Sequence, residues 1–477
     1  MSETFDVVVL GAGPAGANAA LETGHAGLKT LVVEEQHKAG GQVWRAKSSA
    51  IVKAPPTPEG KAGDALRGLL GNSSVAAWYA SRGWQLTASR EGAWRLDVVT
   101  PQGPRVVFAP SLVLATGAQE RVVPVHGWTL PGVIGLAAAT ALIKQEVMLP
   151  GDRTIVAGCG PLVFFVAAEI MRLGGRPAAV VTLNSRQDWV RQLPNLVSRT
   201  DLLAQGVSWI MKLQSAGVPI FWQHGVDSID GQDHVTSAVV RPVDSQWRLR
   251  KEAPSSVVSA DSVAIGHGLM PAVEASRLAG ASHRFAPELG GWVPETDHAG
   301  KTSVANLWIC GDATGIFGAA AAEQQGKLTG LSVAAQMTGR SNTPEQQAVT
   351  ATLIKARKFG AAAARLMDMR PGLVDNVTSE TIVCRCEAIS RGDLEQEIRS
   401  GATSPNAIKS GTRAGMGPCG GRFCRDTVAR LISLNTGQTM EEVGLPTARS
   451  PLRPVAICDL ASPIDYEALP IPGLAPL

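Results

Sequence analysis

The sequence predicts an α/β protein with two Rossmann-like dinucleotide-binding domains, the second inserted in the first. Two strand, glycine-turn and helix units support this prediction, one at residues 5–16 and one at residues 153–163. In each unit an apolar run of strand length precedes the glycines, and an Ala- and Leu-rich stretch follows them. A further apolar run and turn, residues 306–312, comes after the second unit. Its return to the first domain would make the second domain an insertion.

The first glycine turn has the spacing that a bound pyrophosphate requires. Gly11 permits the tight turn, Gly13 lets the backbone approach the phosphates, and Gly16 lets the helix pack closely on the strand. Pro14 and Ala15 complete the turn and open the helix. Free N–H groups and a partial positive charge at the helix N-terminus favour an anion there. The turn therefore predicts a dinucleotide site.

An acidic residue follows at the end of the next apolar strand, residues 30–34. Glu34 stands where an acid accepts hydrogen bonds from a ribose 2′-hydroxyl, and the adjacent Glu35 could share that role. An acid at this place disfavours a 2′-phosphate, so the sequence argues against NADP at the first site.

Three further segments resemble the FAD-binding set of flavoproteins of the pyridine nucleotide–disulfide reductase type. They are Gly40–Gln42, which includes Gly41 and Gln42; the turn Ala115–Gly117, with Thr116 between; and the pair Gly311 and Asp312. The resemblance implies FAD, with Asp312 on the ribityl chain and the 115–117 turn near the nucleotide. No cysteine pair follows Gly41, so disulfide-reductase chemistry is not expected.

The second glycine turn is a weaker dinucleotide motif. Gly158 and Gly160 are present, but Val163 takes the place where Gly or Ala is expected. The next strand ends at Asn184 with no acid to meet an NAD ribose, and Arg186 is an isolated basic residue. The sequence leaves three alternatives open here: reactive NAD(P)H, a bound nucleotide that does not react, or an empty fold kept for packing.

Four of the seven cysteines lie close together near the C-terminus: Cys384, Cys386, Cys419 and Cys424. Four thiolates suit either a [2Fe-2S] cluster or zinc. The Cys-X-Cys spacing is unusual for zinc and favours the cluster, whereas reversible disulfides are least expected in a reducing cytoplasm. Between the pairs, Ser390 and the acids after it predict a capped helix.

The run from residue 412 to residue 424 resembles the bacterioferritin-associated-ferredoxin-type [2Fe-2S] domain of heteromeric amino-acid dehydrogenases. Its Cys-X4-Cys ending matches the dehydrogenase branch of that domain. The resemblance implies that Cys384, Cys386, Cys419 and Cys424 hold a [2Fe-2S] cluster. Cys310 and Cys458 have no place in this pattern.

Nearly the whole chain resembles the FAD subunits of opine dehydrogenases, of hydroxyproline and dye-linked proline dehydrogenases, and of hydrogen cyanide synthase. Residues 128–135 and 266–271 agree with that group. Its members work with a second flavoprotein subunit, similar to glycine or sarcosine oxidase, which oxidises the C–N bond. The resemblance also implies a small ferredoxin-like subunit and, in some relatives, FMN between the two flavoprotein subunits.

These motifs divide the chain into an FAD-binding domain (residues 1–125 and 295–340) and a second dinucleotide-type domain (126–294). A helical linker (341–380), a [2Fe-2S] domain (381–436) and a Pro-rich tail (437–477) follow. The net charge of +3 comes without a basic stripe, so no nucleic-acid partner is expected. The start lacks a signal-peptide pattern and no apolar run is long enough to cross a bilayer, which predicts a cytoplasmic protein.

The function that follows is electron relay in a heteromeric dehydrogenase acting on an amino acid or opine. A flavin takes a hydride pair from an amine, and a [2Fe-2S] cluster passes electrons singly, so the two together convert between the two modes. No catalytic acid, base or nucleophile stands out; His126 and His267 are expected to be structural. The alternatives are a self-sufficient NAD(P)H-dependent reductase, an assembly protein with structural FAD, and a zinc-stabilised module.

Overall fold

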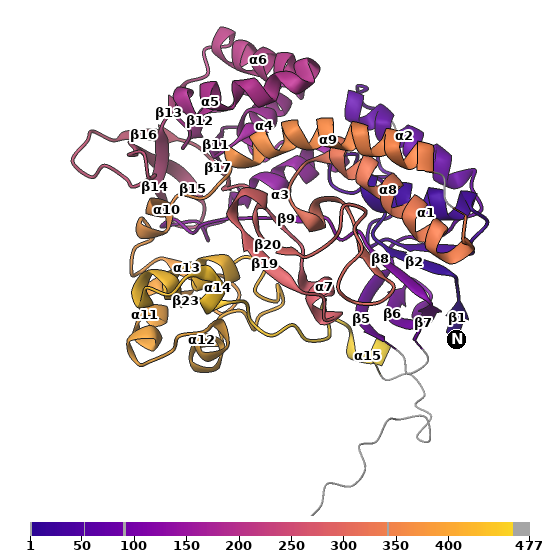
Figure 1. Cartoon of the computed structure of the whole chain (residues 1–477). Helices are drawn as coiled ribbons and strands as arrows, with labels where there is room; N and C mark the ends of the chain where they lie inside the picture. The colour runs from indigo at the N-terminus through magenta and orange to yellow at the C-terminus, as the bar shows by residue number, and fades with distance from the viewer. Residues whose placement is uncertain (1, 52, 89–91, 341–342, 461–477) are drawn as a thin grey trace, which may run out of the picture.

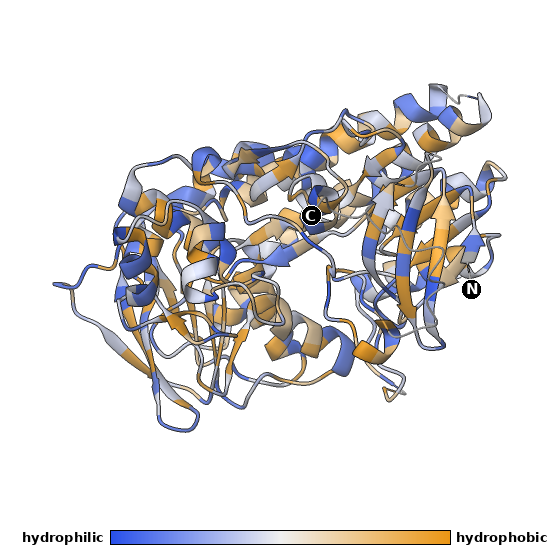
Figure 2. Cartoon of the chain, turned by 90° about the horizontal axis from the view of Figure 1, so that it is seen from below, coloured by the Kyte–Doolittle hydropathy of each residue, from blue (hydrophilic) through white to orange (hydrophobic). Residues whose placement is uncertain are grey.

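The computed structural model describes residues 2–51, 53–88, 92–340 and 343–460. Two parallel sheets lie side by side, and the C-terminal helices pack below the second one (Figure 1). The central parallel strands are mostly hydrophobic, whereas the helices mix hydrophilic and hydrophobic residues (Figure 2). Strands of a parallel sheet are covered on both faces, which explains this distribution.

The first domain is built on a five-stranded parallel sheet of order β21-β8-β2-β3-β4. Its strands are β2 (Val7–Leu10), β3 (Thr30–Val33), β4 (Ala76–Trp78), β8 (Ser111–Leu114) and β21 (Leu307–Ile309). Strand β21 enters this sheet only after the second domain is complete. The predicted insertion of the second domain into the first is therefore confirmed.

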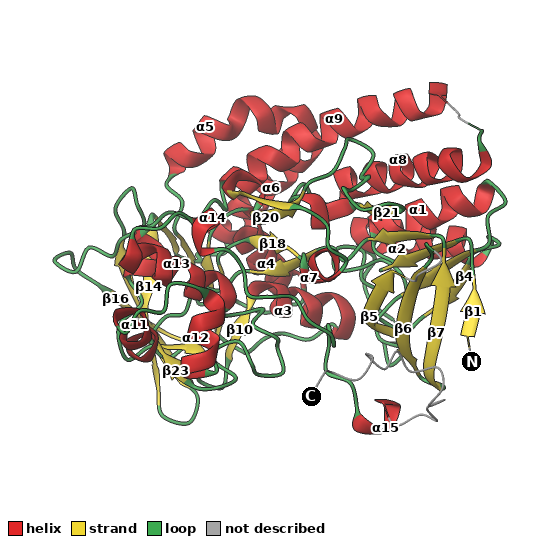
Figure 3. Cartoon of the chain, turned by 60° about the horizontal axis from the view of Figure 1, so that its bottom comes forward, coloured by secondary structure: helices red, strands yellow, loops and turns green. Residues whose placement is uncertain are grey.

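An additional sheet and a long helical layer complete the first domain (Figure 3). The sheet has the order β1-β7-β6-β5 and is antiparallel apart from the pairing of β1 with β7. Its elements and those of the helical layer are β1 (Ser2–Thr4), β5 (Arg82–Ala88), β6 (Trp94–Thr100), β7 (Gly103–Ala109), α1 (Pro14–His25), α2 (Pro58–Gly71) and α8 (Ala319–Thr338).

Helices α1 and α8 approach each other at backbone distance. A Cβ built on Gly326 would lie 2.0 Å from the carbonyl oxygen of Ala15, and one on Gly330 would lie 2.5 Å from that of Ala19. Such separations are far below van der Waals contact, so only glycine fits at these two positions. The close contact brings the start of α8 beside the first glycine turn.

The second domain has its own five-stranded parallel sheet, of order β10-β17-β11-β12-β13. Its elements are β10 (Val133–Gly135), α3 (Leu136–Ala141), β11 (Thr154–Gly158), α4 (Pro161–Arg172), β12 (Ala179–Thr182), α5 (Arg186–Leu196), α6 (Thr200–Ser215), β13 (Ile220–Trp222) and β17 (Ser262–Gly266). An antiparallel sheet of β14 (His224–Gly231), β15 (Val235–Pro242) and β16 (Ser256–Ser259) lies beside it. The predicted α/β class with two dinucleotide-type units is confirmed.

The two domains are joined by an antiparallel pair, β9 (Ala118–Glu120) with β18 (Leu269–Pro271). After it come α7 (Glu274–Leu278) and the hairpin of β19 (His283–Ala286) and β20 (Gly291–Pro294). This connection returns the chain to β21.

The remaining described chain is mainly helical. It comprises α9 (Thr343–Arg365), α10 (Gly372–Asp375), β22 (Ile382–Cys384), β23 (Ile389–Ser390), α11 (Arg391–Arg399), α12 (Pro405–Thr412), α13 (Arg425–Thr436), α14 (Met440–Val443) and α15 (Ile457–Leu460). Helix α11 begins at the N-cap that the sequence predicted. The Ser390 hydroxyl accepts from the Asp393 backbone N–H, and the Asp393 carboxylate accepts from the Ser390 backbone N–H. Of the predicted Pro-rich tail, residues 461–477 lie outside the described residues.

Within the described part of the chain, none of the helices combines the length and the apolar character needed to cross a bilayer. Of the two longest, α9 carries charged residues along its length, and α8 combines Glu323 and Lys327 with several Gln, Gly and Thr residues.

The contact between α1 and α8 can be tested with two glycine substitutions. Gly326→Ala should lower the free energy of unfolding by about 1–3 kcal/mol, because the added methyl overlaps the Ala15 carbonyl. Gly68→Ala is the control: Gly68 is exposed in α2, and a Cβ built there has no neighbour within 4 Å. This change should leave the free energy of unfolding unchanged or raise it by about 0.5–1 kcal/mol. Urea unfolding of both variants measures the difference. Equal effects would contradict the proposed constraint.

Candidate functional site

The first glycine turn lies at the carboxyl edge of the first sheet, between β2 and α1. Gly11 has φ of +104°, and a Cβ there would lie 2.5 Å from the Ala115 carbonyl oxygen. A Cβ on Gly16 would lie 2.0 Å from the Gly11 carbonyl oxygen and 2.8 Å from the Ala115 Cβ. The turn thus packs directly on the residue that follows β8. Gly11, Gly16 and Ala115 form one tightly packed unit.

The start of α1 is open to a ligand. Gly13 is the N-cap and Pro14 the first helical residue, and no side chain caps the helix. The first N–H groups of a helix have no partner within it, so an uncapped start can bind an anion. On its other side, a Cβ on Gly311 would lie 2.7 Å from the Ala15 Cβ, which brings the Gly311–Asp312 pair against the same turn.

Gly41 lies against the glycine turn, where a Cβ would be 2.9 Å from the Gly13 Cα, and the Gly40 N–H donates to the Ala12 carbonyl at 2.8 Å. The next residue, Gln42, points its amide oxygen to the Arg45 guanidinium. The segment from Gly40 to Gln42 therefore forms one wall of the predicted nucleotide site.

The two neighbouring acids point to different places. Glu34 is buried, and its carboxylate accepts from the Ala12 N–H at 2.6 Å and from the Gln36 N–H at 2.8 Å. Burial raises the pKa of Glu34 above its usual value, and the two backbone N–H groups oppose that rise. Glu35 instead pairs on the surface with Arg82, at 3.0 Å. Only Glu34 contacts the glycine turn.

The turn after β8 lies at the same edge. The Thr116 hydroxyl donates to the carbonyl of Ala272 at 2.9 Å, which ties this turn to the chain returning from the second domain. Gly117 has φ of +68° and no neighbour within 4 Å of a built Cβ. In the turn expected near the nucleotide, a hydrogen bond therefore holds Thr116 in place, and the space beside Gly117 is unobstructed.

Asp312 lies in the short 3-10 turn Gly311–Thr314, which follows β21 and precedes α8. Its Oδ1 accepts from the backbone N–H groups of Phe317 and Gly318, each at 3.0 Å, and burial raises its pKa. Oδ2 has no hydrogen bond within the described residues. An oxygen with this freedom fits the hydroxyl of a polyol chain, the role that the resemblance to flavoproteins implied.

Gln325 was missed in the sequence. This buried residue of α8 accepts from the Gly311 N–H at 3.2 Å and from the Thr314 hydroxyl at 3.1 Å, so it fixes the Gly311–Asp312 turn. A polar side chain among the alanines of the following helix is the signal that could have indicated it.

The four predicted ligand cysteines lie together in the C-terminal unit. Cys384 contacts Cys424 and Cys386 contacts Cys419, and the two pairs are close enough to interact electrostatically. Cys384 and Cys424 are buried, Cys386 is exposed, and Cys419 is intermediate. Across the described ranges, no three His, Cys, Asp or Glu side chains surround a single metal position.

Hydrogen bonds favour a thiolate at Cys384. The Cys424 side chain is the largest contributor, and backbone N–H groups of Gly415, Glu387 and Cys386 add to it, so that the pKa of Cys384 falls to about 5. The pKa of Cys424 is raised, first by the same hydrogen bond to Cys384 and then by burial.

Glycines let the backbone fold closely around these sulfurs. A Cβ on Gly417 would lie 2.2 Å from the Cys386 Cβ, and Gly415, Gly420 and Gly421 all have positive φ. Sulfurs that meet in two pairs fit a two-iron cluster, in which each iron takes two protein ligands.

The second glycine turn differs from the first. Gly158 and Gly160 have φ of +140° and +74°, and Val163 is fully buried in the core of the second domain. Asn184, at the end of β12, accepts from the Gly160 N–H at 2.8 Å. Arg186 lies over the Trp222 ring, 5.6 Å from its centroid.

The two histidines singled out in the sequence have structural contacts. His267 is buried, its Nδ1 accepts from the Val123 N–H at 3.0 Å, and burial lowers its pKa to about 3. His126 forms an isolated bridge with Ser228.

A sequence profile of the pyridine nucleotide-disulphide oxidoreductase family matches residues 5–336. The chain belongs to this family. The profile of the BFD-like [2Fe-2S] binding domain matches residues 382–433. An oxidoreductase with a dinucleotide-type fold and a BFD-like [2Fe-2S] binding domain is thus established, in agreement with the motifs of the sequence.

Individual relatives of this oxidoreductase match over nearly their whole length. The A chain of opine oxidase from Agrobacterium tumefaciens (strain Ach5) is 31% identical, covering 97% of this chain and 92% of the relative. The HcnB subunit of hydrogen cyanide synthase from Pseudomonas aeruginosa is 30% identical, and the match covers 94% of this chain and 96% of the relative. The L-proline dehydrogenase of P. horikoshii shares the fold with a TM-score of 0.71 at 22% identity, covering 97% of this chain and 80% of that one.

The roles of Glu34 and Glu35 can be separated by matched variants. Glu34→Gln should raise the dissociation constant for FAD by about 10–100-fold, because an amide NH2 would face one of the two backbone N–H donors and the charge would be lost. Glu35→Gln should leave FAD affinity unchanged, since Glu35 pairs with surface arginines. Fluorescence titration of the apoprotein measures both. A loss of affinity only in the Glu35 variant would reverse the assignment.

Proposed function

We propose that this chain is the electron-transfer subunit of a heteromeric flavin-dependent dehydrogenase that oxidises the C–N bond of an amino acid or opine. The observation that carries the proposal is one chain that combines an FAD-type glycine turn with four cysteines grouped in two pairs. The family matches and the relatives named as enzyme subunits support it.

FAD would be held by the first domain. The uncapped start of α1 would face the pyrophosphate, Glu34 the adenosine ribose and Asp312 the ribityl chain. The free Asp312 oxygen and the close approach of Gly13 and Gly41 fit such an extended ligand. A flavin supplies hydride acceptance, and a [2Fe-2S] cluster supplies one-electron transfer.

Within the relay this chain's own residues bind and position both groups. The Gln325 amide and the α1–α8 contact hold the Gly311–Asp312 turn in place. The backbone N–H groups around Cys384 stabilise negative charge on sulfur, which tunes the potential of a cluster. No substrate acid or base is assigned in this chain, and the amine would be oxidised on the partner.

The partner would be a second flavoprotein subunit resembling glycine or sarcosine oxidase, and a small ferredoxin-like subunit would be a further component. Distant similarity to the alpha chain of sarcosine oxidase from Corynebacterium is consistent with a multi-subunit assembly, although the chain spans only 46% of that relative. FMN would lie between the two flavoprotein subunits, and the complex would work in the cytoplasm.

The geometry argues against the self-sufficient NAD(P)H-dependent reductase. The Gly160 N–H, which would meet a phosphate, is already bonded to Asn184, and Met367 lies against the same glycine. A zinc-stabilised module is disfavoured by the Cys-X-Cys spacing and by the match of residues 382–433 to the BFD-like [2Fe-2S] binding domain.

The cluster can be tested by a matched pair of cysteine variants. Cys384→Ser should abolish acid-labile sulfide and the low-temperature EPR signal of the reduced protein, with FAD occupancy unchanged. Cys458→Ser, an exposed position in α15, should retain both. Anaerobic purification followed by iron and sulfide analysis checks this. Wild-type protein that holds stoichiometric zinc and no sulfide would overturn the proposal.

A further inference from the structure

The segment from Leu366 to Val377, the bridging segment, joins α9 to the [2Fe-2S] domain. It includes α10 and crosses the carboxyl edge of the second parallel sheet, where β11, β12 and β17 end (Figure 1). In open α/β sheets this edge is where a nucleotide binds. The bridging segment therefore lies where a ligand of the second domain would be expected.

The glycine turn of the second domain is in direct contact with this segment. A Cβ built on Gly160 would lie 2.4 Å from the Met367 Cγ, and one on Gly268 would lie 2.8 Å from the Met367 Cβ. The Asn184 side chain accepts from the Gly160 N–H and donates to the Leu366 carbonyl at 2.9 Å. Met367 fills the place for a pyrophosphate, and Asn184, two residues beyond the end of β12, ties the glycine turn to the bridging segment.

Polar anchors fix the rest of the segment. Arg370 bonds Asp188 at 2.7 Å and the Ser245 carbonyl at 2.9 Å, and its guanidinium lies 4.9 Å from the centroid of the Trp247 ring. Asp188 is also the acid of the capping box that starts α5. The segment is thus tied to a helix that itself belongs to the dinucleotide unit.

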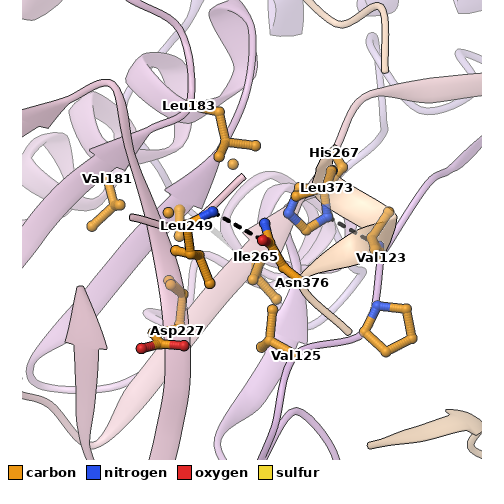
Figure 4. A pocket seen from close by; sticks show the side chains of 15 residues that line it. Val123, Val125, Val181, Leu183, Asp227, Leu249, Ile265, His267, Leu373 and Asn376 are labelled. Carbon is orange, nitrogen blue, oxygen red and sulfur yellow. Dashed lines mark hydrogen bonds between the residues drawn. The ribbon is translucent and has the colours of Figure 1, made fainter. Parts of the chain in front are cut away.

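The far end of the segment is anchored in the same way. Asp375 pairs with Arg248 at 2.7 Å. Asn376 accepts from the Leu249 N–H at 2.9 Å and donates to the Trp247 carbonyl at 2.8 Å, as the close-up shows for Leu249 (Figure 4).

Little of the crevice remains. The cavity in Figure 4 has about 20 Å³ of free volume, lined by Val181, Leu183 and Ile265 of the sheet and closed by Leu373 and Asn376. A volume of that size holds about one water molecule, so neither a ribose nor a nicotinamide fits. This cavity, as the described residues line it, therefore holds no adenine or nicotinamide.

The apolar side of the segment joins two domains into one core. Leu183 and Trp247 of the second domain pack in a single buried cluster with Leu373 of the segment and with Val383 and Leu431 of the [2Fe-2S] domain. Burying apolar surface from three parts of the chain in one core makes their separation unfavourable.

We propose that the second dinucleotide-type domain no longer binds a nucleotide but acts as a docking socket for the [2Fe-2S] domain, with the bridging segment in the former nucleotide crevice. Nucleotide binding there and docking of the cluster domain exclude each other. The proposal depends neither on the identity of the amine nor on the relay itself.

The first arm of the test is nucleotide binding to the purified FAD-loaded chain. NADH, NADPH and ATP, each at up to about 1 mM, the upper end of usual Michaelis constants, should give no calorimetric signal. The proposal would be overturned if two of these nucleotides competed for one site while the [2Fe-2S] domain stayed protected from protease.

The second arm is thermolysin cleavage in the bridging segment, which releases a C-terminal fragment. Arg370→Ala should speed cleavage about tenfold, because proteolysis follows the population of the open state. Arg172→Ala is the matched control: Arg172 pairs with Glu169 at 2.8 Å within α4 and does not touch the segment. Equal cleavage of the two variants would contradict docking through Arg370.

The single variant Asp188→Asn and the double variant Arg370→Ala/Asp188→Asn separate loss of this ion pair from a general folding defect. If Arg370 and Asp188 act through their contact, the double variant should be cleaved no faster than Arg370→Ala, with FAD content and circular dichroism unchanged. Additive acceleration would mean that the two residues act separately, which contradicts the proposed anchor.

Discussion

The structure depends on backbone approaches so close that no side chain fits between the segments. At the first sheet edge, Gly11, Gly16, Gly311 and Gly326 let four segments meet around Ala15 and Ala115. Without these contacts, α8 and its Gln325 could not hold the Gly311–Asp312 turn beside the glycine turn. The site thus depends first on glycines that allow the backbone segments to meet, and second on the hydrogen-bonding groups that these segments bring together.

The two glycine turns show how one fold can serve two purposes. In the first, the helix start is uncapped and a buried acid stands at the end of the next strand. In the second, no acid follows the strand: register places Thr182 where the first domain has Glu34, and Asn184, two residues further on, bonds the turn to the bridging segment. The Glu34 carboxylate can only accept hydrogen bonds, whereas the Asn184 amide accepts from one backbone group and donates to another. In the second domain, the Asn184 hydrogen bonds and the approach of Met367 close the glycine turn against the bridging segment.

The sequence predicted the elements whose signals are local. The two strand-turn-helix units, the insertion and the Ser390 cap follow from short patterns, and the structure confirms them. The weakness of the second turn was also visible in Val163 and Asn184. The bridging segment was not predicted, because its contacts join residues far apart in the sequence, such as Arg370 with Asp188. The role of Gln325 was not predicted either, because it depends on contacts with Gly311 and Thr314 in a preceding turn. The different partners of Glu34 and Glu35 depend on the side of the chain to which each side chain points.

Electron relay between a flavin and a [2Fe-2S] cluster can be followed by mixing the proposed heteromeric complex anaerobically with an amine substrate and recording flavin absorbance and EPR in the same samples. With a relay, the cluster signal should grow after the flavin bleaches and reach one spin per chain. A fully bleached flavin beside a cluster that stays oxidised would contradict it.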